Sequence, residues 1–328
     1  MNSHLPSFPT PAVHPHHPRA QAVPSPAMPS FTQQTKFPCG FYTIASPAGV
    51  HMNPSLVRWG GHLWLTVRSL HINRNTIWIY KLLNNVVQVP GVQIKIPLLY
   101  LSEQQEDPRI FCGTDGRPII SWCQYIPQRT PPHQAYGVLT DAMEVTNVTH
   151  VPHGNNGNCI STNKGPEKNW VFFEHDTKLH FVWGTIPTEI CEVSGHKVSQ
   201  VYKTSPKGIV WPWGQPRGGT PPVLIGDEYF SFFHSSSAYR HTSRYYMGCY
   251  AFEAKPPFRM TKISIKPILA GSEADPHQTS PPFVVFPGGS IYEAGQWLVV
   301  LGINDSKCGW IKIPHADLLG TLTKVEHV

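Results

Sequence analysis

The sequence predicts an all-β fold, a five-bladed β-propeller. Its 328 residues include 34 prolines, 26 glycines and 11% aromatic residues but only 14% charged residues, a composition typical of short strands joined by tight turns. One pattern recurs five times: a polar entry, an apolar strand, a Gly/Asp turn and a second, aromatic-rich strand. No long amphipathic stretch with a spacing of 3.6 residues lies between these strands, which argues against a doubly wound α/β fold.

The first 36 residues are expected to be a disordered tail, and residues 37–328 are expected to form the propeller. The tail is rich in Pro, Ser and His, with the run His14-Pro15-His16-His17-Pro18 at its centre, and it lacks apolar periodicity. Its histidines are interpreted as a solvated segment rather than as a metal site.

The five repeats cover residues 53–68, 105–125, 168–183, 217–234 and 283–305. Their entries lie roughly 50 to 65 residues apart, which is the spacing of one propeller blade per repeat. The first strand of every blade lines the central axis, so the five entries are expected to meet in one pocket. Those entries are Asn53, Asp107, Lys168, Arg217 and Asp305. A β-sandwich with long loops is the structural alternative.

The second repeat opens with Glu106-Asp107-Pro108-Arg109. Pro108 biases Asp107 away from helical geometry, so the carboxylate is expected at a strand end, where a propeller presents a catalytic acid. In isolation the same residues indicate a surface turn with an ion pair between Asp107 and Arg109. Within an axial pocket, Arg109 is expected to position Asp107.

Charge and cysteine content exclude several classes of function. A net charge of +6 is a mild bias toward anionic ligands such as phosphate or a sugar nucleotide, and the scattered Lys and Arg argue against nucleic-acid binding. Seven cysteines without a CxxC pair predict mostly buried free thiols and neither zinc nor disulfides. No apolar run approaches the roughly 18 residues of a membrane span, and residues 1–30 lack the apolar core typical of a secretory signal. We expect a cytoplasmic protein.

Taken together, these repeats resemble glycoside hydrolase family 130, the five-bladed propeller family of β-mannoside phosphorylases with some hydrolases, and related mannosyltransferases. The resemblance runs from about residue 50 to 313. It rests on Asn53-Pro54-Ser55 with Arg68, Glu106-Asp107-Pro108-Arg109, Lys168-Asn169-Trp170, Arg217-Gly218-Gly219-Thr220-Pro221-Pro222, His234 with Tyr245 and Tyr246, Val284-Val285-Phe286-Pro287-Gly288, and Gly302-Ile303-Asn304-Asp305.

The resemblance implies inverting glycosyl transfer on β-mannosides, with Asp107 as the general acid and inorganic phosphate as the nucleophile. Phosphate needs cationic donors rather than the carboxylate base of an inverting hydrolase. The implied phosphate ligands are Arg217, His234, Tyr245 and Tyr246, of which only one tyrosine can face the pocket because side chains alternate along a strand. The implied sugar ligands are Asn53, Ser55, Arg68, Arg109, Lys168, Asn169 and Asp305, with Trp170 or Trp213 as a stacking surface. Neither a metal nor another cofactor is implied.

The sequence also departs from the family. Many of the phosphorylases carry His-Arg-Pro at the end of the third repeat, with the arginine as a phosphate ligand, whereas this chain has Val182-Trp183-Gly184-Thr185-Ile186-Pro187. Lys168 or Arg244 would have to compensate. A mannosyltransferase using a nucleotide sugar, a hydrolase with Glu106 or Glu167 as base, and a non-catalytic glycan-binding propeller therefore stay open. So do the linkage, the acceptor and the oligomeric state.

Overall fold

The computed structural model describes residues 37–44, 49–72, 74–98, 103–126, 132–151, 168–239 and 242–327. All of them belong to the unit that spans Gln33–Val328. The predicted tail, residues 1–36, lies outside the described residues.

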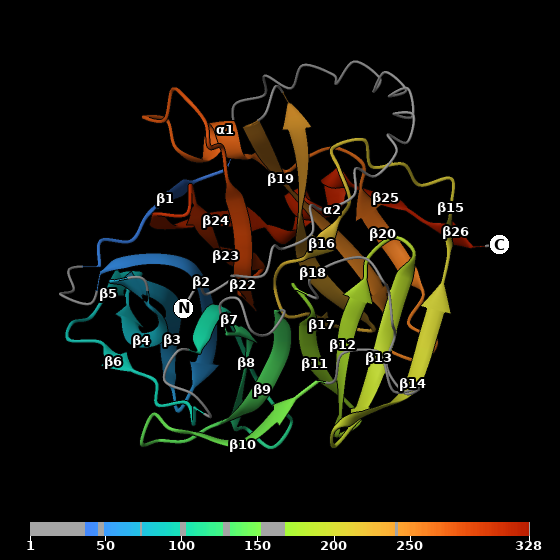
Figure 1. The fold of residues 1–328 in the computed structure, drawn as a ribbon. Helices are drawn as coiled ribbons and strands as arrows, with labels where there is room; N and C mark the ends of the chain where they lie inside the picture. The colour runs from blue at the N-terminus through green and yellow to red at the C-terminus, as the bar shows by residue number, and fades with distance from the viewer. Residues whose placement is uncertain are drawn as a thin grey trace, which may run out of the picture. The chain divides into compact units, whose positions relative to one another are not determined.

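The described strands form five antiparallel sheets of four or more strands and one pair of short strands, a propeller-like all-β architecture (Figure 1). Three sheets consist of consecutive strands. The first contains β2 (Val50–Trp59), β3 (His62–His71), β4 (Arg74–Leu83), β5 (Val86–Val87) and β6 (Val92–Gln93); the second contains β7 (Gln104–Cys112), β8 (Pro118–Tyr125), β9 (His133–Leu139) and β10 (Val145–His150); the third contains β11 (Val171–His175), β12 (Lys178–Gly184), β13 (Thr188–Ser194) and β14 (Lys197–Thr204).

The remaining sheets combine segments that are distant in sequence. The fourth contains β16 (Arg217–Gly218), β17 (Val223–Ile225), β18 (Glu228–Tyr239), β19 (Thr242–Glu253), β20 (Met260–Ser264), β21 (Leu269–Ala270) and β25 (Leu322–Lys324); the fifth contains β22 (Val285–Glu293), β23 (Gln296–Ile303), β24 (Lys307–Pro314) and β1 (Cys39–Phe41); the short pair is β15 (Pro206–Lys207) with β26 (Glu326–His327). The pairing of β1 with β24 joins the beginning of the described chain to its C-terminal sheet.

The predicted hairpins are confirmed, because each of the five repeats contains an antiparallel strand pair. Helix is as scarce as the composition predicts: the described residues contain α1 (Gly271–Ala274) and α2 (His315–Thr321). Within the described residues, no helix has the length and apolar character needed to cross a bilayer.

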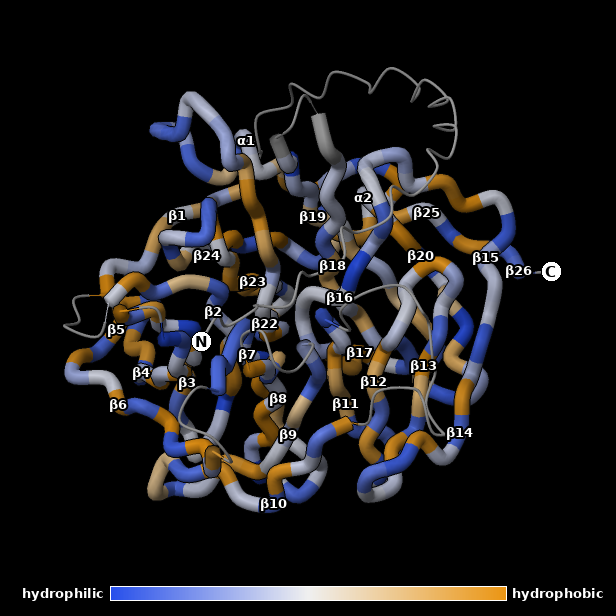
Figure 2. Tube along the Cα trace, in the orientation of Figure 1, coloured by the Kyte–Doolittle hydropathy of each residue, from blue (hydrophilic) through white to orange (hydrophobic). Residues whose placement is uncertain are grey.

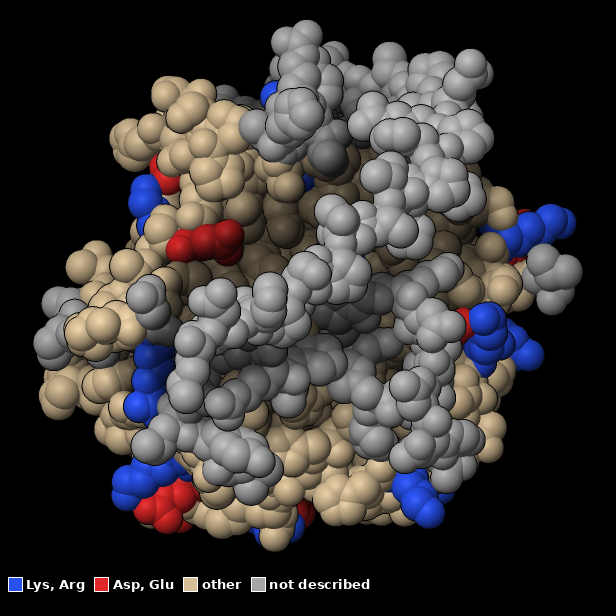
Figure 3. Space-filling model, viewed as in Figure 1, with Lys and Arg blue, Asp and Glu red and all other residues tan. Residues whose placement is uncertain are grey.

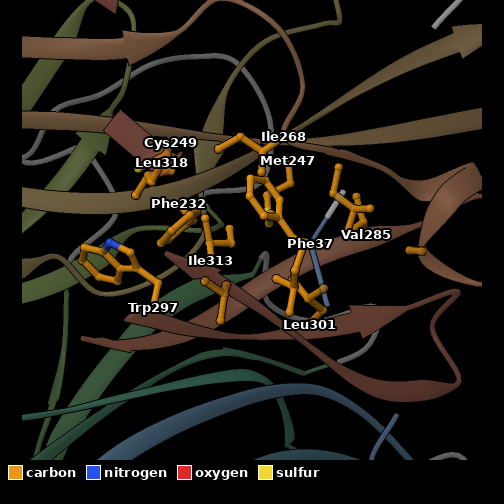
Figure 4. Packing of buried hydrophobic residues seen from close by; sticks show 14 of the residues in the cluster. Phe37, Phe232, Met247, Cys249, Ile268, Val285, Trp297, Leu301, Ile313 and Leu318 are labelled. Carbon is orange, nitrogen blue, oxygen red and sulfur yellow. The ribbon is translucent and has the colours of Figure 1, made fainter. Parts of the chain in front are cut away.

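Buried apolar side chains pack between the sheets. In Figure 2, hydrophobic and hydrophilic residues alternate along many of the strands, as expected for strands with one face in a core. Figure 4 shows the cluster that joins the fourth and fifth sheets, where Phe232, Met247 and Trp297 are fully buried and Phe37 packs beside Leu301. The prediction of mostly buried free thiols is confirmed for the described cysteines, since Cys123, Cys191, Cys249 and Cys308 are buried, Cys39 and Cys112 are exposed, and all six are free. Cys159 lies outside the described residues.

Candidate functional site

Asn53 and Asp107 lie at bulges in two neighbouring strands, β2 and β7. The register of β2 with β3 shifts around Asn53, and the register of β7 with β8 shifts around Asp107. Both residues have left-handed backbones, with φ of 49° and 51°, which Asn and Asp adopt more readily than other non-glycine residues. Each precedes a proline, whose missing N–H suits a bulge. The expectation that Asp107 lies at a strand end is wrong, because the bulge places it inside β7.

The carboxylate of Asp107 is buried between two donors from the first sheet. Asn53 donates from Nδ2 to Oδ1 at 2.7 Å, and Arg68 donates from Nη1 to the same oxygen at 3.3 Å. Only 9% of Asp107 is exposed. These contacts come from β2 and β3, so the packing of the first sheet against the second determines where the carboxylate lies.

Opposing effects set the pKa of Asp107. Burial acts to raise it, but the charges of Arg68, Arg109 and Lys168 and the hydrogen bond from Asn53 together hold the pKa below its ordinary value. Asp107 is therefore a carboxylate at neutral pH when the site holds no ligand.

Glu106, next to Asp107, accepts hydrogen bonds from four side chains. Arg68 Nη2 lies 2.7 Å from Oε1, Tyr125 Oη lies 2.9 Å from it, and Asn75 Nδ2 lies 3.2 Å from it. Lys168 Nζ donates to Oε2 at 3.1 Å. Both oxygens are thus occupied, which argues against Glu106 as the base of a hydrolase. Glu167, the other base considered, lies outside the described residues.

Arg109 contacts the main chain of Asp107 rather than its carboxylate. Its Nη1 donates to the carbonyl of Asp107 at 3.3 Å, its Nε donates to the carbonyl of Gly219 at 2.7 Å, and its Nη2 donates to Asn169 Oδ1 at 3.1 Å. Arg109 is 1% exposed. The predicted roles as positioning partner of the Asp107 side chain and as sugar ligand are therefore corrected: Arg109 joins β7 to residues that adjoin β11 and β16, and Asn53 and Arg68 position the carboxylate.

Ser55, like Arg109, is buried inside the protein. It is fully buried, and its Oγ accepts a hydrogen bond from the Ile110 N–H at 3.1 Å, which ties β2 to β7. The structure does not place Ser55 as the predicted sugar ligand. Asn169, at φ 67°, offers its Oδ1 to Arg109 and lies in the same group of contacts.

His234 is 2% exposed and lies opposite Arg217 in the pairing of β16 with β18. Burial, reinforced by Arg109 and Arg217, lowers the pKa of His234 to about 3. The ring is therefore neutral at physiological pH and does not provide the positive charge expected of a phosphate ligand. Its Nδ1 is buried and has no hydrogen-bond partner in the described part of the chain, which leaves an acceptor lone pair.

The structure distinguishes Tyr245 from Tyr246. The ring of Tyr245 stacks on His234 with centroids 5.9 Å apart, and its pKa is raised by burial and by Asp305 and Asp107, while Arg217 and Lys168 oppose the rise. Tyr246 is buried toward Trp213 on the other face of β19. Tyr245 therefore belongs to the candidate site, and the prediction of Tyr246 as an alternative phosphate ligand is corrected.

Asp305 lies in the turn between β23 and β24, with φ 48°. Burial raises its pKa, as do the charges of Asp107 and Glu106, whereas Arg68 acts in the opposite direction. These interactions place Asp305 in the electric field of the group formed by Asp107, Glu106 and the side chains that contact their carboxylates, which we call the Asp107 group.

A cavity of about 450 Å³ adjoins this group of residues, at the beginning of β11 and β16. Lys168 and Arg217 supply its cationic wall, and Asn169 and Gln215 supply amides. The segment 183–187, which lacks the family arginine, also lines the cavity, as does Glu189. The volume falls within the range of small-molecule sites.

A larger cavity of about 1020 Å³ lies at the other ends of the first strands. It is lined by residues such as Arg58, Thr114, Glu174 and Glu293, and by none of the residues predicted for the site. We assign the site to the Asp107 group, because that group combines buried ionisable side chains with perturbed pKa values and a cavity.

Asn75 and Tyr125 also belong to the Asp107 group, although the sequence predicts no role for either of them. Asn75 lies at the beginning of β4 and contacts Glu106 and Arg68, and Tyr125 lies at the end of β8. Neither adjoins a recognisable motif. Trp170 and Trp213, the implied stacking surfaces for the sugar, are both buried against other aromatic rings: Trp170 stacks on Phe181 with centroids 4.6 Å apart, and Trp213 packs on Trp211.

No protein-family model matches this sequence, and no curated protein does. Solved structures are similar. The β-1,2-mannobiose phosphorylase of Listeria innocua, solved with β-1,2-mannobiose, superposes on 85% of this chain and 94% of its own with a TM-score of 0.60 at 13% identity. A mannose phosphorylase of Leishmania mexicana, solved with phosphate, superposes on 88% and 91% with a TM-score of 0.62 at 15% identity.

A third structure comes from glycoside hydrolase family 130, described as a family of mannoside phosphorylases that contains hydrolases of β-1,2-mannosidic linkages. It covers 80% of this chain and 84% of its own, with a TM-score of 0.60 at 16% identity. The resemblance seen in the sequence is confirmed at the level of the fold: this chain has the fold of the mannoside phosphorylases.

Proposed function

We propose that this protein is a carbohydrate-active enzyme that acts on β-mannosides by inverting glycosyl transfer, with Asp107 as the proton-transferring residue. We also propose that each of the five large sheets is one blade, so that Asp107 lies on the wall of a central pocket. The observation that carries this proposal is the buried Asp107 carboxylate, which Asn53 and Arg68 hold in place. Its neighbour Glu106 contacts Lys168, which lines a cavity together with Arg217.

The lowered pKa of Asp107 suits the synthetic direction of such a reaction. A carboxylate accepts the proton of the acceptor hydroxyl as that oxygen attacks the anomeric carbon of mannose 1-phosphate and phosphate leaves from the opposite face. In the part of the chain that the structure describes, both hydrogen bonds to the carboxylate reach Oδ1. Oδ2 is thus left for proton exchange.

Phosphorolysis is the same reaction in reverse. Asp107 must then be protonated before it donates toward the glycosidic oxygen, and the resemblance implies a relay through a sugar hydroxyl. Phosphate attacks the anomeric carbon while Arg217, Lys168 and Tyr245 offer donors to its oxygens.

A second candidate is a mannosyltransferase that uses a nucleotide sugar. It is favoured by the composition of the cavity lining, which combines Trp183, Ile186 and Pro187 with the cations Lys168 and Arg217. The proton transfer to Asp107 would be the same, and only the leaving group would differ.

The test is to incubate the protein with mannose plus either mannose 1-phosphate or GDP-mannose, and separately with β-mannobiose plus phosphate. New oligosaccharide from mannose 1-phosphate, or mannose 1-phosphate from mannobiose, supports phosphorylase chemistry. Product from GDP-mannose alone supports the transferase. Mannose binding without turnover under any condition would show a glycan-binding protein instead.

A further inference from the structure

Glu106 is contacted by side chains from two sheets and from the segment that precedes β11. Arg68 and Asn75 reach it from the first sheet, Tyr125 from the second, and Lys168 from the segment that begins the third. Only 5% of Glu106 is exposed. A buried carboxylate with four donors is stable because these contacts replace the water it has lost.

The two cations that Glu106 contacts act on different parts of the site. Arg68 also reaches the Asp107 carboxylate. The side chain of Lys168 is 33% exposed, lies over the Tyr125 ring with Nζ 5.6 Å from its centroid, and lines the same cavity as Arg217. A lysine ammonium on a flexible stem has no fixed direction of its own. The contact with Glu106 supplies that direction.

We infer that Glu106 is a positioning residue that holds Lys168 at the edge of the cavity as a ligand for the phosphate group of the substrate, and holds Arg68 against Asp107. The inference rests on the proposed function, because it names the group of the substrate that Lys168 binds. Glu106 itself exchanges no proton with the substrate.

The substitution Glu106→Gln separates this role from a purely structural one. The amide retains an acceptor for Arg68, Asn75 and Tyr125, but it presents an NH2 group to Lys168 in place of Oε2. We expect the KM for mannose 1-phosphate, and the Kd for inorganic phosphate measured by calorimetry, to rise about tenfold, with a smaller change in kcat. Lys168→Gln should cause a similar rise in both constants.

The double variant distinguishes positioning from independent effects. If Glu106 acts through Lys168, the double variant should bind phosphate no more weakly than Lys168→Gln alone, since interacting residues are not additive. The matched control is Glu228→Gln, which removes another partly buried carboxylate paired with a lysine, Lys262, outside the candidate site. It should leave phosphate binding unchanged.

A direct measurement does not depend on turnover. The pKa of Lys168 is raised, because Glu106, Cys123 and Asp107 outweigh the effect of burial. A titration of dimethylated lysines by 13C NMR should show this pKa falling in Glu106→Gln and unchanged in Glu228→Gln. If Glu106→Gln does not fold, Glu106→Asp retains the charge, shortens its reach to Lys168, and should weaken phosphate binding.

Unchanged phosphate binding, or additive losses in the double variant, would overturn the inference. A different result would contradict the proposed function, namely that the wild-type protein shows no turnover with any of the donors. Phosphate calorimetry and the lysine titration report on Glu106 in either case.

Discussion

Asn53 donates a hydrogen bond of 2.7 Å to Asp107 although 54 residues separate the two in sequence. Both have left-handed backbones in neighbouring first strands. Such residues store about 1–3 kcal/mol of strain each, which the surrounding contacts must offset. The pair thus concentrates strain, burial and charge at one point of the fold, as functional sites often do.

Asp107→Asn should reduce kcat at least about 100-fold, since it removes the proton-transferring oxygen while the amide preserves the volume. Near-ultraviolet circular dichroism should remain that of the wild type. Asp227→Asn, in a turn that lines the larger cavity, is the control and should keep full activity. Substantial turnover by Asp107→Asn would assign the proton transfer to another group.

Arg217→Ala should raise the KM for mannose 1-phosphate or phosphate more than it lowers kcat. Arg217 is exposed at the beginning of β16 and lines the cavity, so its loss removes a charge-assisted hydrogen bond, an effect of about tenfold or more. The melting temperature should hardly change. Arg117→Ala, which removes an exposed arginine paired with Asp115, is the control. A KM equal to that of the wild type would rule out the anion-binding role.

Tyr245→Phe should weaken phosphate binding, whereas Tyr246→Phe should not. The two side chains lie on opposite faces of β19, and the charges of Asp305, Asp107 and Arg217 act on Tyr245, whereas Tyr246 packs toward Trp213. Each substitution removes a single oxygen, so the pair forms its own control. Equal effects in steady-state kinetics would contradict the assignment of Tyr245 to the site.

The pH dependence of the free energy of unfolding should reveal the lowered pKa of His234. Its pKa is about 3 in the folded protein and about 6.5 when unfolded, so the unfolded chain binds one more proton between these values. Stability is therefore fully present above pH 6.5, and this residue alone should cost about 1.4 kcal/mol for each unit that the pH falls below it. Urea unfolding should show a shallower slope in His234→Phe. Parallel curves would mean that the imidazole is protonated in the folded state.

Gly302→Ala should lower both stability and activity. A Cβ at Gly302 would lie 2.0 Å from Asn53 Oδ1, so Asn53 would have to shift, which would disturb its hydrogen bond to Asp107. We expect a loss of about 1–3 kcal/mol in the free energy of unfolding, as in other overpacked sites, and a lower kcat. Gly320→Ala is the control, since no atom lies within 4 Å of the added Cβ. Wild-type kcat in Gly302→Ala would show that Asn53 does not position Asp107.

The distribution of positive charge on the surface indicates which ligands the protein is expected to bind. On the face shown in Figure 3, the described Lys and Arg side chains are scattered rather than gathered into one patch, which agrees with the argument against nucleic-acid binding. The cations that matter to the proposed function, Lys168 and Arg217, act through their place at a cavity rather than through the net charge.

The strands and turns of this protein follow from its local sequence. Hairpins such as β2–β3, with Gly60 and Gly61 at left-handed turn positions, depend on local pattern and turn chemistry, which neighbouring residues encode. The spacing of the repeats and their motifs also identify Asn53, Asp107 and Lys168 as candidates for a common site.

The contacts of these side chains, in contrast, depend on the tertiary structure. The motif predicts Arg109 at the Asp107 carboxylate, but Arg109 donates to backbone carbonyls instead. A Cβ added to Gly218 would lie 2.2 Å from the Asn169 carbonyl oxygen, so glycine at this position allows the two backbones to approach each other. Asn75 and Tyr125 belong to the site without any motif. Charge, burial and pKa depend on distances between sheets, and these are set by packing between segments far apart in the chain.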